Sequence, residues 1–186
     1  MTDLFGEDIR RDAVFKSESE RILLTRRWHS GGPVALCIGC NPSTADARQE
    51  DATTHTLNRW FRAHGYAGYD IMNLYPFCTS SPAECRRIAD WEKNGPDYAA
   101  RDAMWFNIGE LVKFAKMADR VFACWGNIAW DGDWTEHVVE QIQTGTEPWL
   151  DLWCFGTTKS GAPKHPMARG KHRITEDTPM KLWRTT

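Results

Sequence analysis

In four short segments of the sequence, an apolar run is followed directly by side chains that can bind or act on a polar ligand. They are "GCNPS" (Gly39–Ser43), "NLYPF" (Asn73–Phe77), "WGN" (Trp125–Asn127) and "GTTK" (Gly156–Lys159), and the last leads on to His165. An asparagine amide offers a hydrogen-bond donor and an acceptor, and a histidine can give or take a proton near neutral pH. Each segment alone has the composition of an ordinary turn, so any chemistry depends on whether the four segments meet.

The order of the surrounding elements predicts that these segments do meet. Apolar runs typical of strands begin at Val34, Tyr69, Arg120 and Trp149. Segments typical of helices lie between and around them: Ala52–His64, Pro82–Trp91, Tyr98–Met117 and Asp133–Gly145. This alternation predicts a three-layer α/β/α fold whose central sheet has about four, mostly parallel strands. The carboxyl ends of parallel strands share one rim, and open α/β sheets bind their ligands there.

The rest of the chain completes a single domain. Two segments, "AVFKS" and "RILLTRRW", predict an N-terminal strand pair joined by a polar turn. The tail after Gly170 is basic and is expected to be irregular. No repeat or long linker divides the 186 residues, so we expect one domain, 1–186, with its core at about 34–170.

The composition of the chain indicates where the protein is located and which partners and cofactors it can bind. The charged start "MTDLFGEDIRRD" is unlike a signal peptide, and no apolar run is long enough to cross a membrane, so we expect a cytoplasmic protein without membrane partners. Cys37 and Cys40 form a C-x-x-C inside an apolar strand, without a second cluster at zinc spacing, which favours buried thiols. We therefore expect neither a metal nor another cofactor. The net charge of −2 means that nucleic acid would have to bind a local basic patch; the oligomeric state stays open.

Three acidic residues, Asp46, Glu50 and Asp51, follow the first turn closely. Their simplest role is to cap a helix that starts near Ala52, where the helix dipole favours negative charge, and Asp51 fits this role best. One of the three could instead be a base that activates water, for which Asp46 is the candidate, or a ligand for Mg²⁺.

The four segments together resemble the uracil-DNA glycosylase superfamily, in the form of its mismatch-specific and single-strand-selective branches. "GCNPS" is similar to its first motif, "MNLYPF" to its second-strand segment, "VFACWGNIA" to a later strand end, and "KHPMARG" to its final His-Pro motif. All four occur in the order of the superfamily. More narrowly, "NPSTAD", "MNLYPF" and "WGN" resemble an uncharacterised domain family of bacterial and phage proteins.

The superfamily resemblance implies roles for individual residues. Asn41 would orient the attacking water, Asn73 would read the base edge, and His165 would either donate to an oxygen of the leaving base or contact the nucleic-acid backbone. The substrate-binding residues implied are Gly39, Cys40, Pro42, Ser43, Asn73, Tyr75, Phe77, Trp125 and Asn127, with Tyr75 or Phe77 stacking on the base. The nucleic-acid backbone would meet Lys159, Lys164, Arg169 and Lys171. One residue departs from the superfamily pattern, since Met167 stands where its final motif usually has serine.

Three functions are consistent with these segments. The first is a DNA glycosylase-like hydrolase that flips a normal or modified nucleobase out of single- or double-stranded DNA and cleaves its N-glycosidic bond. The second is a non-catalytic nucleic-acid-binding module of the same fold. The third is a hydrolase of free nucleosides or nucleotides, which would suit the slightly acidic chain.

Overall fold

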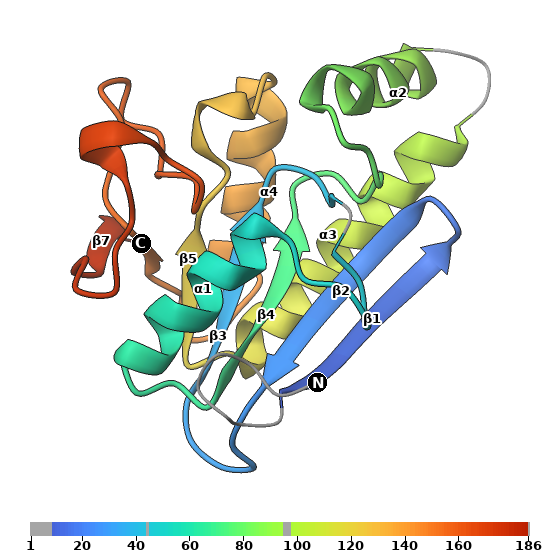
Figure 1. Ribbon diagram of the computed structural model, residues 1–186. Helices are drawn as coiled ribbons and strands as arrows, with labels where there is room; N and C mark the ends of the chain where they lie inside the picture. Colours follow the sequence, from blue (N-terminus) through green and yellow to red (C-terminus); the bar gives the residue numbers. More distant parts are fainter. Residues whose placement is uncertain (1–8, 44, 95–97, 186) are drawn as a thin grey trace.

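Within the part of the chain that the structure describes, the fold consists of one seven-stranded mixed sheet and four α-helices. A computed structural model describes residues 9–43, 45–94 and 98–185 (Figure 1). The strands are β1 (Arg10–Ser17), β2 (Glu20–Arg27), β3 (Val34–Gly39), β4 (Gly68–Asn73), β5 (Arg120–Ala123), β6 (Leu152–Cys154) and β7 (Lys181–Arg184). The helices are α1 (Ala52–Ala63), α2 (Pro82–Asn94), α3 (Ala99–Met117) and α4 (Gly132–Thr144), and two short 3-10 turns are η1 (Gly126–Ile128) and η2 (Gly170–His172).

The centre of the sheet is parallel and its edges are antiparallel. The strand order is β1-β2-β4-β3-β5-β6-β7, and β4, β3, β5 and β6 pair in parallel. At one edge β2 runs antiparallel to β4 and forms a hairpin with β1; at the other edge β7 runs antiparallel to β6. The sequence pattern predicted the α/β class and the N-terminal strand pair.

Two predictions about the sheet need correction. The sheet has seven strands rather than about four, because the N-terminal hairpin joins it through β4 instead of standing apart. The tail after Gly170 is not irregular throughout, because Leu182 and its neighbours in β7 pair with β6. Both edges depend on contacts between distant parts of the chain, which local sequence patterns do not encode.

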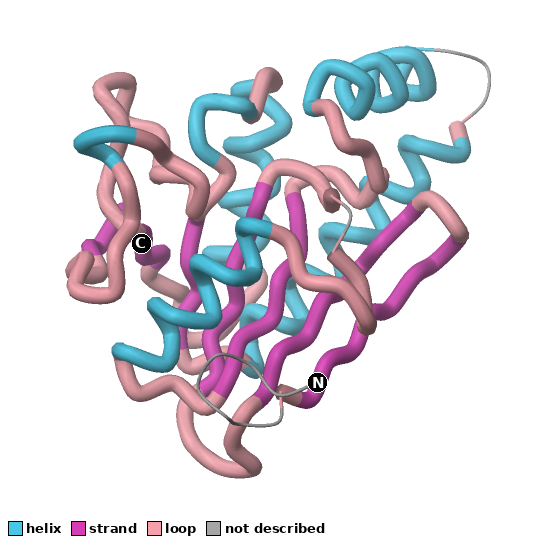
Figure 2. The backbone as a smooth tube through the Cα atoms, viewed as in Figure 1, coloured by secondary structure: helices cyan, strands magenta, loops and turns pink. Residues whose placement is uncertain are grey.

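Helices cover both faces of the sheet, as the tube view also shows (Figure 2). On one face, α1 packs Leu57, Trp60 and Phe61 against β3, β4 and β5 side chains such as Phe122. On the other face, α2, α3 and α4 pack against the remaining strand side chains, including Ile38. Both faces of β3 and β4 are therefore buried.

The described elements show no helix that is both long and apolar enough to cross a lipid bilayer. The longest described helix, α3, carries charged residues along its length, among them Arg101, Glu110 and Lys113.

Candidate functional site

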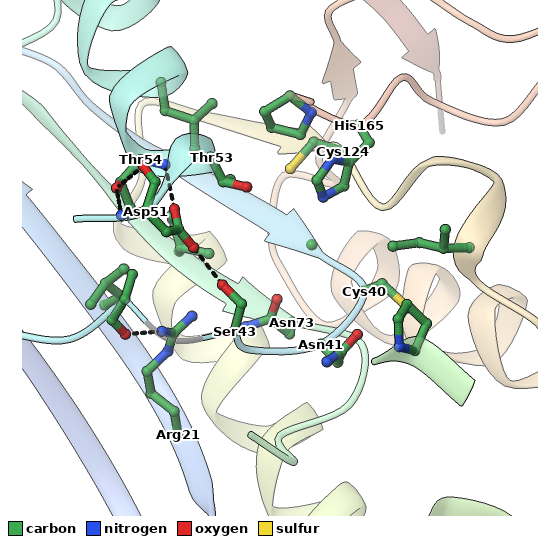
Figure 3. Close-up of a pocket in the computed structure, with 18 of the residues that line it drawn as sticks. Arg21, Cys40, Asn41, Ser43, Asp51, Thr53, Thr54, Asn73, Cys124 and His165 are labelled. Atoms are coloured by element: carbon green, nitrogen blue, oxygen red, sulfur yellow. Dashed lines mark hydrogen bonds between the residues drawn. The ribbon is translucent and has the colours of Figure 1, made fainter. Parts of the chain in front are cut away.

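A cavity of about 180 Å³ lies at the carboxyl ends of β3 and β4 (Figure 3). Its walls come from the β3–α1 turn, the start of α1, the segment before α2, the start of β2 and the loop that carries His165. The lining residues are Arg21, Leu24, Gly39, Cys40, Asn41, Ser43, Ala45, Asp51, Thr53, Thr54, Leu57, Ile71, Asn73, Thr79, Ser80, Pro82, Cys124, Ile128, His165 and Pro166. Asn41, Asn73 and His165, predicted from separate segments, therefore line one cavity.

Asn73 is one of the most deeply buried polar residues in this wall. It ends β4 opposite Gly39, and its side chain is only 3% exposed. A Cβ atom on Gly39 would lie 2.6 Å from Oδ1 of Asn73, so the missing side chain makes room for this amide. The backbone carbonyl of Asn73 accepts from Nδ2 of Asn107 at 2.8 Å, whereas Nδ2 of Asn73 has no hydrogen-bond partner among the described residues. A buried donor without an acceptor is costly, and a bound ligand would supply one.

Hydrogen bonds from its side-chain nitrogen hold Asn41 so that its side-chain oxygen can accept a hydrogen bond from a ligand. Nδ2 donates to the carbonyl oxygen and to Oγ1 of Thr79, each at 3.1 Å, and to the carbonyl of Pro42. These bonds tie the β3–α1 turn to the segment before α2 and fix which side of the amide is the acceptor. Within the described residues, all side-chain hydrogen bonds of Asn41 are made by Nδ2, which leaves Oδ1 able to accept from water or a ligand.

His165 is half-buried and held in one tautomer. Its Nδ1 accepts from the backbone N–H of Met167 at 3.1 Å, so the proton of the neutral ring lies on Nε2. Burial lowers the pKa of His165, and the more distant Asp51 carboxylate opposes this only in part. The ring is therefore neutral at pH 7, with an N–H available for donation. Gly126, at φ +68°, allows the loop to approach, because a Cβ there would lie 2.9 Å from Cβ of His165.

Asp51 supplies a carboxylate to the cavity and caps α1. It accepts from the backbone N–H of Thr54 at 2.8 Å and from Oγ of Ser43, and the Thr54 side chain completes a capping box. Burial opposes ionisation of Asp51, but these hydrogen bonds outweigh it and hold the pKa of the carboxyl below its usual value. The sequence prediction of a helix cap is confirmed, and the same carboxylate faces the cavity.

Arg21 is a cavity residue that the sequence analysis missed. It lies near the start of β2, and its residue is 4% exposed. Nη1 donates to the carbonyl of Ala45, while Nε is buried without a partner. Because β2 runs antiparallel to β4, the first residues of β2 lie beside the carboxyl end of β4. Accordingly, the backbone N–H of Arg21 donates to the carbonyl of Pro76, just beyond β4.

Asp46 and Glu50 lie outside the cavity lining. The carboxylate of Asp46 accepts from the backbone N–H groups of Arg48 and Gln49, and these bonds lower its pKa. Glu50 accepts from Nε of Arg11 and Nε of Arg26, each at 2.9 Å. Of the three neighbouring acidic residues, Asp51 is thus the one in the cavity wall, whereas Asp46 had been the candidate base.

Several residues that the resemblance implied for substrate binding are also absent from the lining. Tyr75 is buried and stacks on Trp130, with ring centroids 4.3 Å apart, and it does not line the cavity. Phe77 is a core residue, and Trp125 packs edge-on against Trp183. Asn127 accepts from Thr158 and Ser160 outside the cavity, and the buried Pro42 contributes its backbone carbonyl to the turn.

Three other expected residues do line the cavity. Ser43 and Gly39 contribute as described above. Cys40 is 1% exposed, and burial raises the pKa of its thiol to about 12, so it stays protonated and apolar in character. All six cysteines are free.

The basic residues expected to meet a nucleic-acid backbone lie on the loops after β6. Lys159, Arg169 and Lys171 are exposed, and Lys164 is half-buried, with its stem packed beside Gly156. Met167, close to His165, is 41% exposed and reaches Oγ1 of Thr56 at the start of α1. This segment thus stands beside the cavity and in contact with solvent.

One family model matches the part of the chain that contains this site. A family model described as "Protein of unknown function (DUF1643)" matches residues 21–167. The chain belongs to the DUF1643 family. The matched DUF1643 region begins at Arg21 and ends at Met167, so it contains every residue that lines the cavity. No curated protein and no solved structure matches the chain.

Proposed function

We propose that this DUF1643 protein hydrolyses the N-glycosidic bond of a nucleobase, in the manner of the uracil-DNA glycosylase superfamily that its motifs resemble. The observation that carries the proposal is the set of unused polar atoms around one cavity. Nδ2 of Asn73 is buried without a partner, Oδ1 of Asn41 is left open, and Nε2 of His165 carries a proton. A nucleobase has the complementary donors and acceptors on its edge.

The size of the cavity suits a single flat ring. At about 180 Å³ it is smaller than the roughly 300–1,000 Å³ of pockets that hold drug-sized ligands. Apolar walls from Leu57, Ile71 and Cys124 surround the polar atoms. A base would leave its stack to enter, with the sugar at the mouth near the exposed Met167.

Cleavage would proceed through a transition state like an oxocarbenium ion, with negative charge on the departing base. Oδ1 of Asn41 accepts a hydrogen bond from the attacking water and orients it towards the sugar carbon. The bond from that carbon to the base nitrogen breaks, the water oxygen takes its place, and the proton that the water loses passes through solvent to the departing base anion. The amide is too weak a base to ionise that water, so the rate depends on positioning and electrostatics. The ionised Asp51 places a negative charge in the same cavity, which favours the cationic sugar.

His165 and Asn73 would stabilise the leaving base. The neutral His165 ring donates from Nε2 to a base oxygen on which negative charge develops, and it needs no change of protonation to do so. The buried Nδ2 of Asn73 donates to a second acceptor on the same ring. Both donors are held in place before substrate binds, Asn73 by its fit against Gly39 and His165 by its bond to Met167.

The decisive test compares Asn41→Ala with Asn127→Ala. Both asparagines follow core strands of the sheet, but Asn127 lies outside the cavity lining. Each protein would be incubated with single- and double-stranded oligonucleotides, genomic DNAs carrying modified bases, and free nucleosides, and released bases would be identified by mass spectrometry. We expect release by the unmutated protein, a loss of at least about tenfold in Asn41→Ala, and no loss in Asn127→Ala.

Other outcomes would separate the alternatives. Salt-sensitive binding of oligonucleotides without release of any base would favour the non-catalytic binding module. Release from nucleosides alone would favour a hydrolase of free monomers. Normal turnover of a folded Asn41→Ala protein would contradict the role given to the asparagine oxygen.

A further inference from the structure

The end of the cavity at β2 contains a buried positive charge that has no ionic partner. Arg21 is 4% exposed. No carboxylate among the described residues lies within the 4.0 Å of an ion pair with its guanidinium, and Nε has no hydrogen-bond partner. Removing a guanidinium from water without a counter-charge costs several kcal/mol, so such a group is normally paired. Figure 3 shows this guanidinium turned towards Ser43 and the cavity rather than to the outside.

The groups around Arg21 do not form an ion pair with it: burial lowers its pKa, and the Asp51 and Asp46 carboxylates attract its charge and oppose that effect without contacting it. The Asp51 carboxylate, the nearest candidate in the cavity, already accepts from Ser43 and from the Thr54 amide at the start of α1. Asp46 is turned to the Arg48 and Gln49 amides. Burial raises the pKa of the Cys78 thiol, in spite of the nearby Arg21, so it is neutral at pH 7. Arg26, the other neighbour, is itself positive.

The segment before α2 adds no negative charge to the same wall. Thr79, Ser80 and Pro82 line the cavity there, and none of them carries a carboxylate. The carboxylate of Asp51 is therefore the negative group of the cavity lining, and it already caps α1.

We propose that the Arg21 end of the cavity binds an anionic oxygen of the substrate, next to the base edge that faces Asn73. The anionic oxygen belongs either to a carboxylate carried by the base or to the phosphate of the same nucleotide. This inference rests on the proposed function for the identity of the base, but the buried charge at Arg21 is an independent observation.

The test uses ligand pairs that differ in one anionic group. The first pair is thymine and 5-carboxyuracil; the second is uridine and uridine 5′-monophosphate; inorganic phosphate is measured alone. Affinities would be measured by calorimetry for the full chain, for Arg21→Met and for Arg27→Met. Arg27 is the control because it lies on the same strand but pairs with Asp70 and lies outside the cavity.

We expect the anionic member of one pair to bind the unmutated protein at least about tenfold more tightly than its neutral partner. The first pair identifies a base carboxylate and the second a nucleotide phosphate. The preference should disappear in Arg21→Met and persist in Arg27→Met. Ligand-free Arg21→Met should keep its melting temperature or raise it, because the substitution removes an unpaired buried charge.

Two results would overturn the inference. The first is equal affinity of the unmutated protein for both members of both pairs. This result would overturn the inference even if Arg21→Met failed to fold. Binding of inorganic phosphate without any preference within the pairs would mean a site for a free anion, not for the substrate. Base release is measured separately, so a charge preference without turnover would leave the Arg21 site standing while the hydrolase proposal fails.

Discussion

Two buried arginines on the same strand, Arg26 and Arg21, have opposite surroundings. Arg26 is fully buried, and three of its nitrogen atoms donate: Nε to Glu50, Nη1 to the carbonyl of Thr25 and Nη2 to the carbonyl of Asp46. Arg21 is almost as buried, yet one bond to the carbonyl of Ala45 is the only side-chain hydrogen bond found for it in the described residues.

This difference distinguishes the charge of Arg26, which stabilises the fold, from the charge of Arg21, which we infer binds a ligand. The charge of Arg26 is neutralised by Glu50, which also accepts from Arg11, so this cluster joins β1, β2 and the segment before α1. The charge of Arg21 faces a cavity and keeps an unused donor. Binding sites hold polar groups that folding alone leaves unsatisfied, because their partners arrive with the ligand.

The largest expected effect lies in the paired cluster. Glu50→Gln keeps the shape of the side chain but leaves Arg11 and the buried Arg26 without a negative partner, so we expect a loss of about 3–5 kcal/mol in the free energy of unfolding. Urea denaturation at pH 7 measures it. The control is Asp90→Asn in the exposed Arg86–Asp90 pair, which should cost about 1 kcal/mol or less. Equal losses in both variants would remove the contrast between Arg26 and Arg21.

A smaller effect is expected where the cavity depends on backbone shape. Gly126→Ala forces an L side chain into φ +68° and brings its Cβ to 2.9 Å from Cβ of His165, so we expect a loss of about 2–3 kcal/mol in the free energy of unfolding. Gly161→Ala is the matched control, since φ is +84° there but no atom lies within 4 Å of the new Cβ. Urea denaturation gives both losses. If the two variants lose the same stability, Gly126 does not position His165.

The charge of Asp51 makes a still smaller, pH-dependent contribution. Its folded pKa is lowered, so the stability it adds is present above the unfolded pKa and is lost as pH falls through the folded pKa. Asp51→Asn keeps the α1 cap but loses the charge, and we expect a deficit of about 1 kcal/mol near pH 7. Thermal melts from about pH 7 to pH 2 should show this deficit shrink in acid. A deficit that stays constant with pH would mean that the carboxylate charge is not involved.

The smallest effect is expected at the cavity thiol. Because burial raises the pKa of Cys40 to about 12, very little thiolate is present at pH 8, and Cys40 should resist iodoacetamide in the folded protein. Peptide mass spectrometry before and after unfolding measures the change. Rapid labelling of Cys40 in the folded protein would indicate a reactive nucleophile and a different chemistry for the cavity.

The sequence predicted the parts of the site that depend on local signals. Apolar runs located β3 and β4, so Asn41 and Asn73 were expected at one rim, and they do line one cavity. The Asp51 cap is also a local signal, a short acceptor three residues before Thr54. His165 was predicted from its motif, and its loop reaches the cavity through the glycine at position 126.

Other features could not be predicted because they depend on distant contacts. Arg21 reaches the cavity because β2 pairs with β4 some fifty positions along the chain, and its own segment reads as an ordinary amphipathic strand. Tyr75 follows Asn73 by two residues, which would place both on one face of a continuing strand, but β4 ends at Asn73. Tyr75 therefore packs with Trp130 and Trp134 instead.

The β1–β2 hairpin and the parallel strands contribute different residues to the cavity. The parallel strands and their helices hold the two asparagines, while the residue that would sense the charge of a substrate comes from a two-stranded edge with a short polar turn. If the proposed function holds, substitutions in that edge would alter which molecules are accepted without changing the strands that hold Asn41 and Asn73, so the hairpin is the natural starting point for engineering selectivity in this protein.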